Sequence, residues 1–272
     1  MQKSNSNKKA KTILLTSVKG GVSKTTTSYN LATNLANKGY SVHILDLDIQ
    51  RSCAKTFENR ITTFDSETKE TELKIELEET NPNYLSNFNI KRLNQKLEEI
   101  QHYKSLNLYV SSVNIESDVA SYVRSIQSEY DFIICDSKCE VTQTTTIDIM
   151  NIADLVIFPY LDSALDLETV GEIDLLVKSN IIKNKYTNTI YRSILICDNT
   201  ISKNEEAEFV QFFKSFYSES QPLLNHTIKK RKAYKEAIFA GKGVCEVKTT
   251  PSTVKAQNEF LAVAQEILNL LK

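Results

Sequence analysis

The sequence predicts an α/β protein with a mainly parallel, twisted sheet covered by helices on both faces. Short apolar runs alternate with amphipathic stretches along almost the whole chain, as expected for strands and the helices that cover them. The apolar runs are continuous rather than interleaved with polar residues, which indicates strands buried on both sides. A chain of 272 residues is long enough to build one large domain around such a sheet.

Six apolar runs are predicted as strands: 13–15, 42–45, 106–110, 132–135, 155–159 and 190–197. Helical spacing predicts helices near 25–38, 89–103, 116–128, 142–152, 164–180 and 203–217. The segment 252–271 is predicted as a terminal helix packed on the sheet. A membrane-surface helix is the alternative, and it is disfavoured because the segment carries few basic residues.

Two polar segments define the domain boundaries. Residues 1–11 are polar and basic and are predicted as a disordered arm, which leaves one domain over 12–272. Residues 65–79 contain seven acidic residues against two lysines, so the stretch 65–83 is predicted as an acidic surface insertion or solvated loop.

Charge and hydropathy exclude several classes of protein. A net charge of −1 excludes a globally basic nucleic-acid binder, so any DNA binding must come from a local patch. No apolar run approaches the roughly 18 residues of a membrane span, and we expect no membrane partner and a cytoplasmic location. The five cysteines are scattered and odd in number, which favours reduced structural thiols over a disulfide framework.

The segment 17–27 is the strongest functional signal in the chain. It follows an apolar run, contains Gly20 and Gly21, and leads into a stretch with helical spacing. Strand, glycine-rich turn and helix together form a cradle of backbone N–H groups for phosphate, and the helix N-terminus adds partial positive charge. Lys24 then supplies a full charge to the terminal phosphates, and the Thr25 hydroxyl can bind Mg²⁺. The segment therefore predicts a nucleoside triphosphate site.

The strict P-loop pattern fails at two positions, where Val18 and Ser23 replace glycine. The remaining pattern, Lys-Gly-Gly-x-x-Lys-Thr-Thr, resembles the deviant Walker A loop of the ParA/MinD family of ATPases, in which a further lysine, here Lys19, precedes the glycine pair. If the backbone at residue 23 needs a positive φ, serine costs roughly 1 kcal/mol relative to glycine, and hydrolysis is expected to be slow.

The resemblance implies a single-domain P-loop NTPase fold and assigns roles along the loop. Lys24 would grip the β- and γ-phosphates, Thr26 the α-phosphate, and Lys19 would reach the phosphates of a second protomer. The expected nucleotide contacts are Lys19, Gly20, Gly21, Val22, Ser23, Lys24, Thr25 and Thr26.

Two acidic motifs complete the predicted chemistry. Asp46 and Asp48 lie at positions i and i+2 at the end of a predicted strand, so both side chains are expected to face Mg²⁺-nucleotide. Asp48 resembles the family aspartate that orients the attacking water, and Ile49 replaces the family's proline. The apolar run ending in Asp136 resembles the Walker B strand, whose carboxylate supports the metal. The expected metal-site residues are Thr25, Asp48 and Asp136.

An iron–sulfur site at Cys139 is disfavoured, because no cysteine lies between Cys53 and Cys135 to provide a second ligand.

Basic residues cluster between 229 and 235, where five of seven side chains are cationic. Such a run is either a solvated helix face or a phosphate-binding patch, and in the resembling family this region binds DNA without sequence preference. The predicted DNA contacts are Lys229, Lys230, Arg231, Lys232 and Lys235.

The resemblance to short partition ATPases implies the following function. The protein is expected to dimerise on ATP with Mg²⁺, bind DNA non-specifically on the nucleoid, and hydrolyse ATP when stimulated by a ParB-like centromere-binding adaptor. Two alternatives stay open: a MinD-like positioning ATPase acting on membrane or protein cargo, and a nucleotide-dependent regulator that does not hydrolyse ATP.

Overall fold

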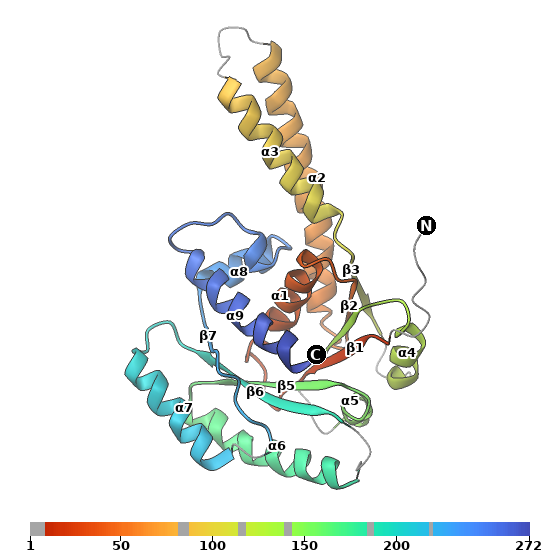
Figure 1. Cartoon of the computed structure of the whole chain (residues 1–272), viewed down its shortest axis with the longest axis vertical. Coiled ribbons are helices and arrows are strands. Elements are labelled where there is room, and N and C mark those ends of the chain that lie inside the picture. Colours follow the sequence, from red (N-terminus) through yellow and green to blue (C-terminus); the bar gives the residue numbers. More distant parts are fainter. Residues whose placement is uncertain (1–8, 81–86, 114–117, 139–142, 184–187, 218–219) are drawn as a thin grey trace.

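The computed structural model describes residues 9–80, 87–113, 118–138, 143–183, 188–217 and 220–272, and there it confirms the predicted α/β architecture. Seven strands form one parallel sheet in the order β3-β2-β4-β1-β5-β6-β7 (Figure 1). The strands are β1 (Lys11–Leu15), β2 (Val42–Asp46), β3 (Leu108–Ser112), β4 (Phe132–Asp136), β5 (Leu155–Leu161), β6 (Ile190–Cys197) and β7 (Ile228–Lys229).

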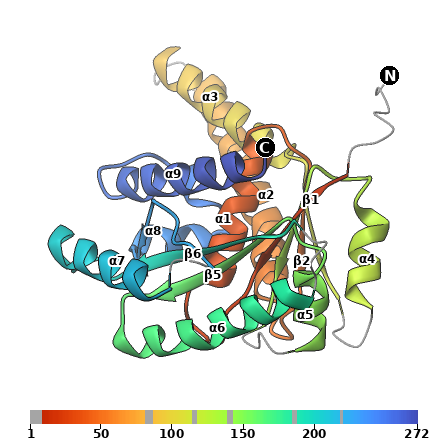
Figure 2. The same ribbon diagram turned by 60° about the horizontal axis from the view of Figure 1, so that its bottom comes forward.

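Helices cover both faces of the sheet (Figure 2). They are α1 (Lys24–Asn37), α2 (Ser52–Thr80), α3 (Asn87–Lys104), α4 (Val119–Ile126), α5 (Thr144–Met150), α6 (Ala164–Lys183), α7 (Lys203–Tyr217), α8 (Lys232–Phe239) and α9 (Val254–Leu270), with a 3₁₀ turn η1 at Val244–Glu246.

Side chains of β1 alternate between two cores, as a strand's period of two requires. Ile13 and Leu15 lie in the core with α1 and α9, whereas Leu14 lies in the core with α4 to α7.

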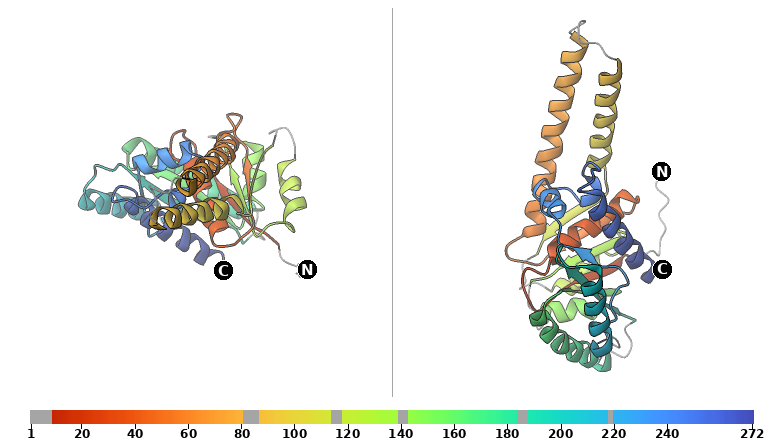
Figure 3. Two further views of the ribbon diagram at one scale, coloured as in Figure 1. Left: turned by 90° about the horizontal axis from the view of Figure 1, so that it is seen from above. Right: turned by 90° about the vertical axis from the view of Figure 1, so that its left-hand side faces the viewer.

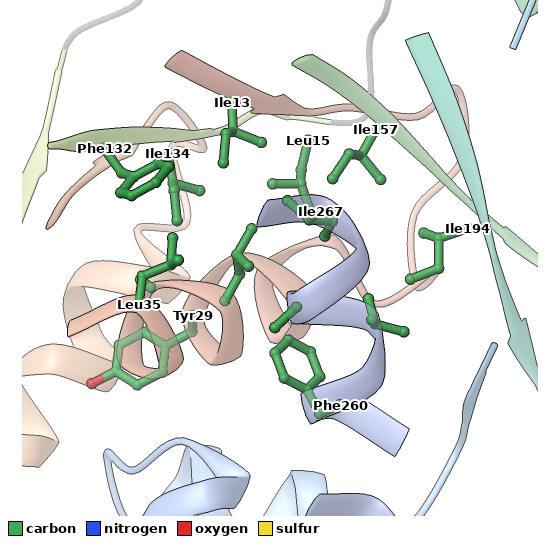
Figure 4. Packing of buried hydrophobic residues seen from close by; sticks show 14 of the residues in the cluster. Ile13, Leu15, Tyr29, Leu35, Phe132, Ile134, Ile157, Ile194, Phe260 and Ile267 are labelled. Atoms are coloured by element: carbon green, nitrogen blue, oxygen red, sulfur yellow. The ribbon is translucent and has the colours of Figure 1, made fainter. Parts of the chain in front are cut away.

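One core lies between the sheet and the helices α1 and α9, beside the loop of residues 16–23 that joins β1 to α1 and is called the phosphate loop below. Figure 4 shows Tyr29 and Leu35 of α1 and Phe260 and Ile267 of α9 packed against the apolar strand residues. The terminal helix α9 thus packs on the sheet as predicted, since most of its apolar residues are buried in this core. No helix in the described part of the chain is long and apolar enough to cross a membrane.

The long helix α2 differs from the prediction. The loop alternative for 65–83 is wrong over 65–80, because these residues continue one helix that begins at Ser52; residues 81–83 lie outside the described residues, and the acidic surface insertion stays a prediction. The reason is local, because no glycine or proline interrupts 52–80 and Glu70 pairs with Lys74 one turn later. With α3 it forms a hairpin that extends beyond the rest of the molecule (Figures 1 and 3).

The other boundary differences are small. Residues 1–8 of the predicted N-terminal arm lie outside the described residues, and Lys11, assigned to that arm, is the first residue of β1. The basic run is divided between elements: Lys229 ends β7, two residues form a connection, and α8 begins at Lys232.

Candidate active site

The loop between β1 and α1 lies at the carboxyl ends of the strands, beside the point where the order of the sheet reverses. This is the edge at which open α/β sheets bind ligands. Gly21 has φ 75°, and Ser23, immediately before α1, has φ 66° and ψ 26°. Ser23 is therefore left-handed, in a conformation that costs a residue with a Cβ roughly 1–2 kcal/mol.

The two lysines of the loop occupy different environments. Lys24 is buried, and its Nζ donates to Ser17 Oγ at 2.8 Å and to the Lys19 carbonyl at 3.4 Å. Lys19 is more exposed, and its Nζ lies 3.5 Å from Asp166 Oδ1. Asp166 is buried at the start of α6 and also accepts the backbone N–H of Leu161 at 2.9 Å, so it is held in place. The loop thus has one lysine inside it and another on its outer side.

Asp136 lies beneath the loop, as its position at the end of the predicted Walker B strand suggested. Its carboxylate accepts from Thr25 Oγ1 at 2.7 Å, from Ser28 Oγ at 2.9 Å and from the Cys53 thiol at 3.5 Å. Burial raises the pKa of Asp136 to about 6, against the opposing effect of the Thr25 and Ser28 hydrogen bonds. A buried carboxylate in this setting is well placed to meet a cation.

The Asp46 and Asp48 carboxylates, which the sequence predicts to face the nucleotide together, have different hydrogen-bond partners. Asp46 pairs in register with Asp136 across β2 and β4, but its carboxylate accepts the backbone N–H groups of Ala54 at 3.0 Å and Asp48 at 3.1 Å. Burial raises the pKa of Asp46, and its contact with Ala54 anchors the start of α2. Asp48 is partly exposed and accepts the local Gln50 N–H at 2.9 Å. Asp46 is therefore structural, and Asp48 is the more accessible carboxylate.

The residues present suit Mg²⁺ bound together with a phosphate. No cluster of three or more His, Cys, Asp or Glu residues that could hold a metal occurs within the described ranges. Thr25 and Asp136 instead bring two oxygen donors together beside the phosphate loop. Mg²⁺ is commonly bound in this way, by one or two protein oxygens with phosphate oxygens and water as the remaining ligands.

A cavity of about 510 Å³ joins the phosphate loop to the basic run. Its lining includes Ser23 and Thr26 on one side and Lys230 and Lys235 on the other. The volume lies within the roughly 300–1,000 Å³ of small-molecule sites. The residues predicted for nucleotide and those predicted for DNA therefore border one cavity.

Three of the five predicted DNA contacts form ion pairs within the protein, and two of these three side chains, Lys229 and Arg231, are partly buried. Lys229 Nζ lies 2.9 Å from Glu206, and Arg231 pairs with Glu259 and donates to Asn199 at 2.8 Å. The exposed members of the run are Lys230, Lys232 and Lys235, of which Lys232 pairs with Glu236 one turn along α8 at 2.8 Å.

Sequence reasoning missed two side chains that position this site. Ser28 lies one turn after Thr25 on α1, so the spacing i, i+3 was available as a signal. Asp166 lies in the segment 163–167, which resembles partition ATPases, but its contact with Lys19 joins segments that are distant in sequence and was not predicted. Cys139, the residue of the disfavoured iron–sulfur site, lies outside the described residues.

A family model described as "AAA domain" matches residues 10–192. A stretch of 40 residues is 55% identical to the septum site-determining protein MinD of Neisseria meningitidis serogroup B; it spans only 15% of either chain.

Solved structures resemble the chain over nearly its whole length. A putative plasmid partition protein from Borrelia burgdorferi B31, bound to AMPPNP, matches 96% of this chain and 99% of its own with a TM-score of 0.58 and 17% identity. Apo McdA from Cyanothece matches 95% and 99% with a TM-score of 0.62 and 16% identity. MinD in the MinC:MinD complex of Aquifex aeolicus matches 96% of both chains with a TM-score of 0.59 and 16% identity. At these identities the likeness concerns the fold.

Proposed function

The chain belongs to the AAA domain family and has the fold of the ParA/MinD-type ATPases, and on that premise we propose that it is an ATP-dependent DNA partition ATPase. The observation that carries the proposal is the pair of loop lysines. Lys24 is buried where it can meet phosphate within its own site, whereas Lys19 lies outside, within 3.5 Å of Asp166.

ATP and Mg²⁺ are the proposed ligands. Lys24 and the N–H groups at the start of α1 bind the β- and γ-phosphates, and Thr26, which lines the cavity, binds the α-phosphate. Thr25 and Asp136 would hold Mg²⁺, which when bound neutralises charge on the β- and γ-phosphates. The AMPPNP complex of the Borrelia protein and the Mg-ADP complex of MinD from Pyrococcus horikoshii support this choice of ligand.

Asp48 is the proposed catalytic carboxylate for hydrolysis. It follows β2 on the same sheet edge as the phosphate loop and, unlike Asp46, remains partly exposed. A carboxylate in that position accepts a hydrogen bond from a water molecule and orients it for in-line attack on the γ-phosphate.

ATP is proposed to select a dimer of two protomers. Lys19 leaves Asp166 and reaches the phosphates of the partner protomer, so nucleotide charge offsets the repulsion between facing lysines. Each dimer then presents two copies of the exposed lysines Lys230, Lys232 and Lys235 to DNA. Two linked sites bind far more tightly than one. Nucleoid association and release by a ParB-like centromere-binding adaptor follow from this scheme.

DNA binding with defined nucleotides tests the proposal. Anisotropy of a labelled duplex should show tighter binding with ATP than with ADP, and two unrelated duplex sequences should bind equally. Lys24→Ala should abolish the ATP effect, since the phosphates lose their direct cationic partner. Equal DNA affinity with ATP, with ADP and without nucleotide would refute the proposed function.

A MinD-like positioning ATPase is the second candidate, favoured by the 40-residue match to MinD. Helix α9 gives this candidate little support, because most of its apolar residues are buried in the core and Leu261 is its one large apolar side chain that is exposed in the described structure. Co-sedimentation with liposomes of anionic lipid, compared with co-sedimentation with plasmid DNA, distinguishes the two functions.

A further inference from the structure

Phe239, the last residue of α8, is an apolar side chain that the proposed function leaves without a role. It is 84% exposed, more than any other large apolar side chain in the described ranges. Exposure alone does not indicate a site, because isolated apolar side chains are common on protein surfaces. What distinguishes Phe239 is its position, since two of the exposed lysines proposed to bind DNA, Lys232 and Lys235, lie on the same helix.

The exposure of Phe239 is fixed by the packing of α8. The opposite face of this helix is buried, and Tyr234 Oη there donates to the Ala256 carbonyl at 2.9 Å. Directly after the helix, Gly241 packs so closely on α2 that a Cβ at Gly241 would lie 2.1 Å from the Arg60 backbone nitrogen. Helix α8 is therefore held at its inner face and next to its C-terminal end, and it presents the Phe239 ring to solvent.

Phe239 lies on the same face of α8 as the two lysines. At 3.6 residues per turn, Lys232, Lys235 and Phe239 project within about 60° of one another. At 1.5 Å per residue, Phe239 lies about 6 Å beyond Lys235 along the helix axis. Glu236 shares this face and pairs with Lys232 at 2.8 Å, whereas Lys235 forms no ion pair with any described residue. The exposed ring therefore has an available cation one turn away.

Charges on the neighbouring segments leave this face cationic. On α2, the backbone of Asn59 borders Gly241, and Lys55 is exposed one turn earlier. The nearby carboxylate of Glu58 pairs with Arg51 at 3.5 Å. Asp198 lines the cavity at the phosphate loop, before the start of α8, and accepts from its own loop at 2.7 and 2.9 Å.

Duplex DNA is the partner that fits a cationic face with one exposed ring. Lysines bind phosphates, and an apolar side chain inserted from the minor groove partly unstacks base pairs and kinks the duplex. The spacing of about 6 Å between Lys235 and Phe239 matches a minor groove about 6 Å wide, with the lysine on its wall and the ring inside it. A lipid surface fits less well, because membrane-surface helices carry a broad apolar face, whereas the other apolar residues of α8 are buried or partly buried.

We infer that Phe239 is an apolar wedge that enters the minor groove of duplex DNA and partly unstacks two base pairs, while Lys232 and Lys235 bind the adjacent phosphates. The wedge contacts no hydrogen-bonding edge of a base, so it adds affinity without direct readout of sequence. Its contribution is not electrostatic and therefore does not change with salt concentration. The inference rests on the DNA binding proposed above.

Anisotropy of a labelled duplex, with ATP and Mg²⁺ over a range of salt concentrations, tests the inference on the full chain. Phe239→Ala should weaken binding at least about tenfold at every salt concentration, which corresponds to 1.4 kcal/mol, and should leave the log–log salt slope unchanged. Lys235→Ala should instead lower that slope by about 0.9. Ile182→Ala, at a 67% exposed position on α6, is the matched control and should change neither quantity.

Ring closure of short DNA by ligase measures the kink itself. A fragment shorter than the persistence length of about 150 base pairs closes slowly unless a protein bends it. At protein concentrations that saturate the fragment, the parent should speed ring closure and Phe239→Ala should not. Phe239→Trp should keep the effect, because its larger ring can still insert. Circular dichroism should show that both variants fold as the parent does, since residue 239 is exposed.

The possible failures are distinguishable. Equal duplex affinity of the parent and Phe239→Ala, a lower salt slope in that variant, or ring closure as fast as with the parent would overturn the inference and leave the proposed function in place. A parent that binds no duplex with any nucleotide would refute both. Loss of ATP-dependent dimerisation in Phe239→Ala would place the ring against a second copy of the chain, and loss of parental binding to anionic vesicles would place it in a membrane. Either result would also overturn the inference.

Discussion

Replacing Ser23 by glycine should stabilise the protein although it removes a side chain. Ser23 has φ 66° and ψ 26°, where a Cβ clashes with the following carbonyl at a cost of roughly 1–2 kcal/mol. Glycine relieves this clash but gives the unfolded chain more freedom, which opposes the gain by about 0.4–1 kcal/mol. The expected net rise in the free energy of unfolding is about 1 kcal/mol.

Urea denaturation of the parent and three variants checks the value. Ser23→Ala keeps the Cβ and should be no more stable than the parent. Ser66→Gly, at an exposed position inside α2, should lose about 0.5–1 kcal/mol, because there glycine has only its entropic cost. If Ser23→Gly is less stable than the parent, or equal to Ser23→Ala, the loop carries no strain at this residue and the reasoning fails.

Three more outcomes are expected. Asp48→Ala should bind ATP, dimerise and stay on DNA while phosphate release falls, since it removes water positioning and leaves the phosphate loop intact. Lys230→Ala with Lys235→Ala should lower the log–log salt slope of DNA binding by about 0.9 for each phosphate that the variant no longer neutralises. Burial lowers the pKa of His43 from 6.5 to about 4, so the unfolded chain binds the proton more tightly and stability falls with falling pH. From about pH 7 to about pH 5 the decrease is about 2 kcal/mol, and His43→Phe should remove it in pH-dependent denaturation.

Each of these outcomes has a control or a contradicting result. Unchanged steady-state hydrolysis in Asp48→Ala would remove that residue from the catalytic role. Lys229→Ala should change the salt slope less than the exposed lysines do, because Lys229 already pairs with Glu206. His102→Gln, at an exposed position on α3, should keep the parent's pH dependence of stability. If His43→Phe loses as much stability as the parent does when the pH falls from about 7 to about 5, groups other than His43 cause that loss.

The parts of the fold that were predictable are those encoded locally. The strands ending in Leu15 and Asp136 are short apolar runs, and the loop between β1 and α1 is defined by glycine and lysine at close spacing. The distal part of α2 was missed because polar residues with no apolar period resemble a loop, although Glu, Lys and Leu are good helix formers and nothing interrupts the run.

The parts of the site that were not predictable depend on interactions between distant segments. The Lys19–Asp166 pair joins the loop after β1 to the start of α6, and Arg60–Glu246 joins α2 to the C-terminal segment 186 positions later. The run 229–235 was visible as charge, but only the tertiary structure shows that Lys229 and Arg231 face acidic partners. The sequence therefore shows which side chains are charged, but only the fold shows which of them are exposed and can contact a ligand.

Light scattering after size exclusion tests the central claim most directly. The parent is expected to be a monomer with ADP or without nucleotide and a dimer with ATP and Mg²⁺. Lys19→Ala should still bind labelled ATP but stay a monomer, because its own phosphate site keeps Lys24 while no lysine reaches the partner's phosphates. A parent that stays monomeric with saturating ATP, or a Lys19→Ala variant that dimerises as the parent does, would contradict the account.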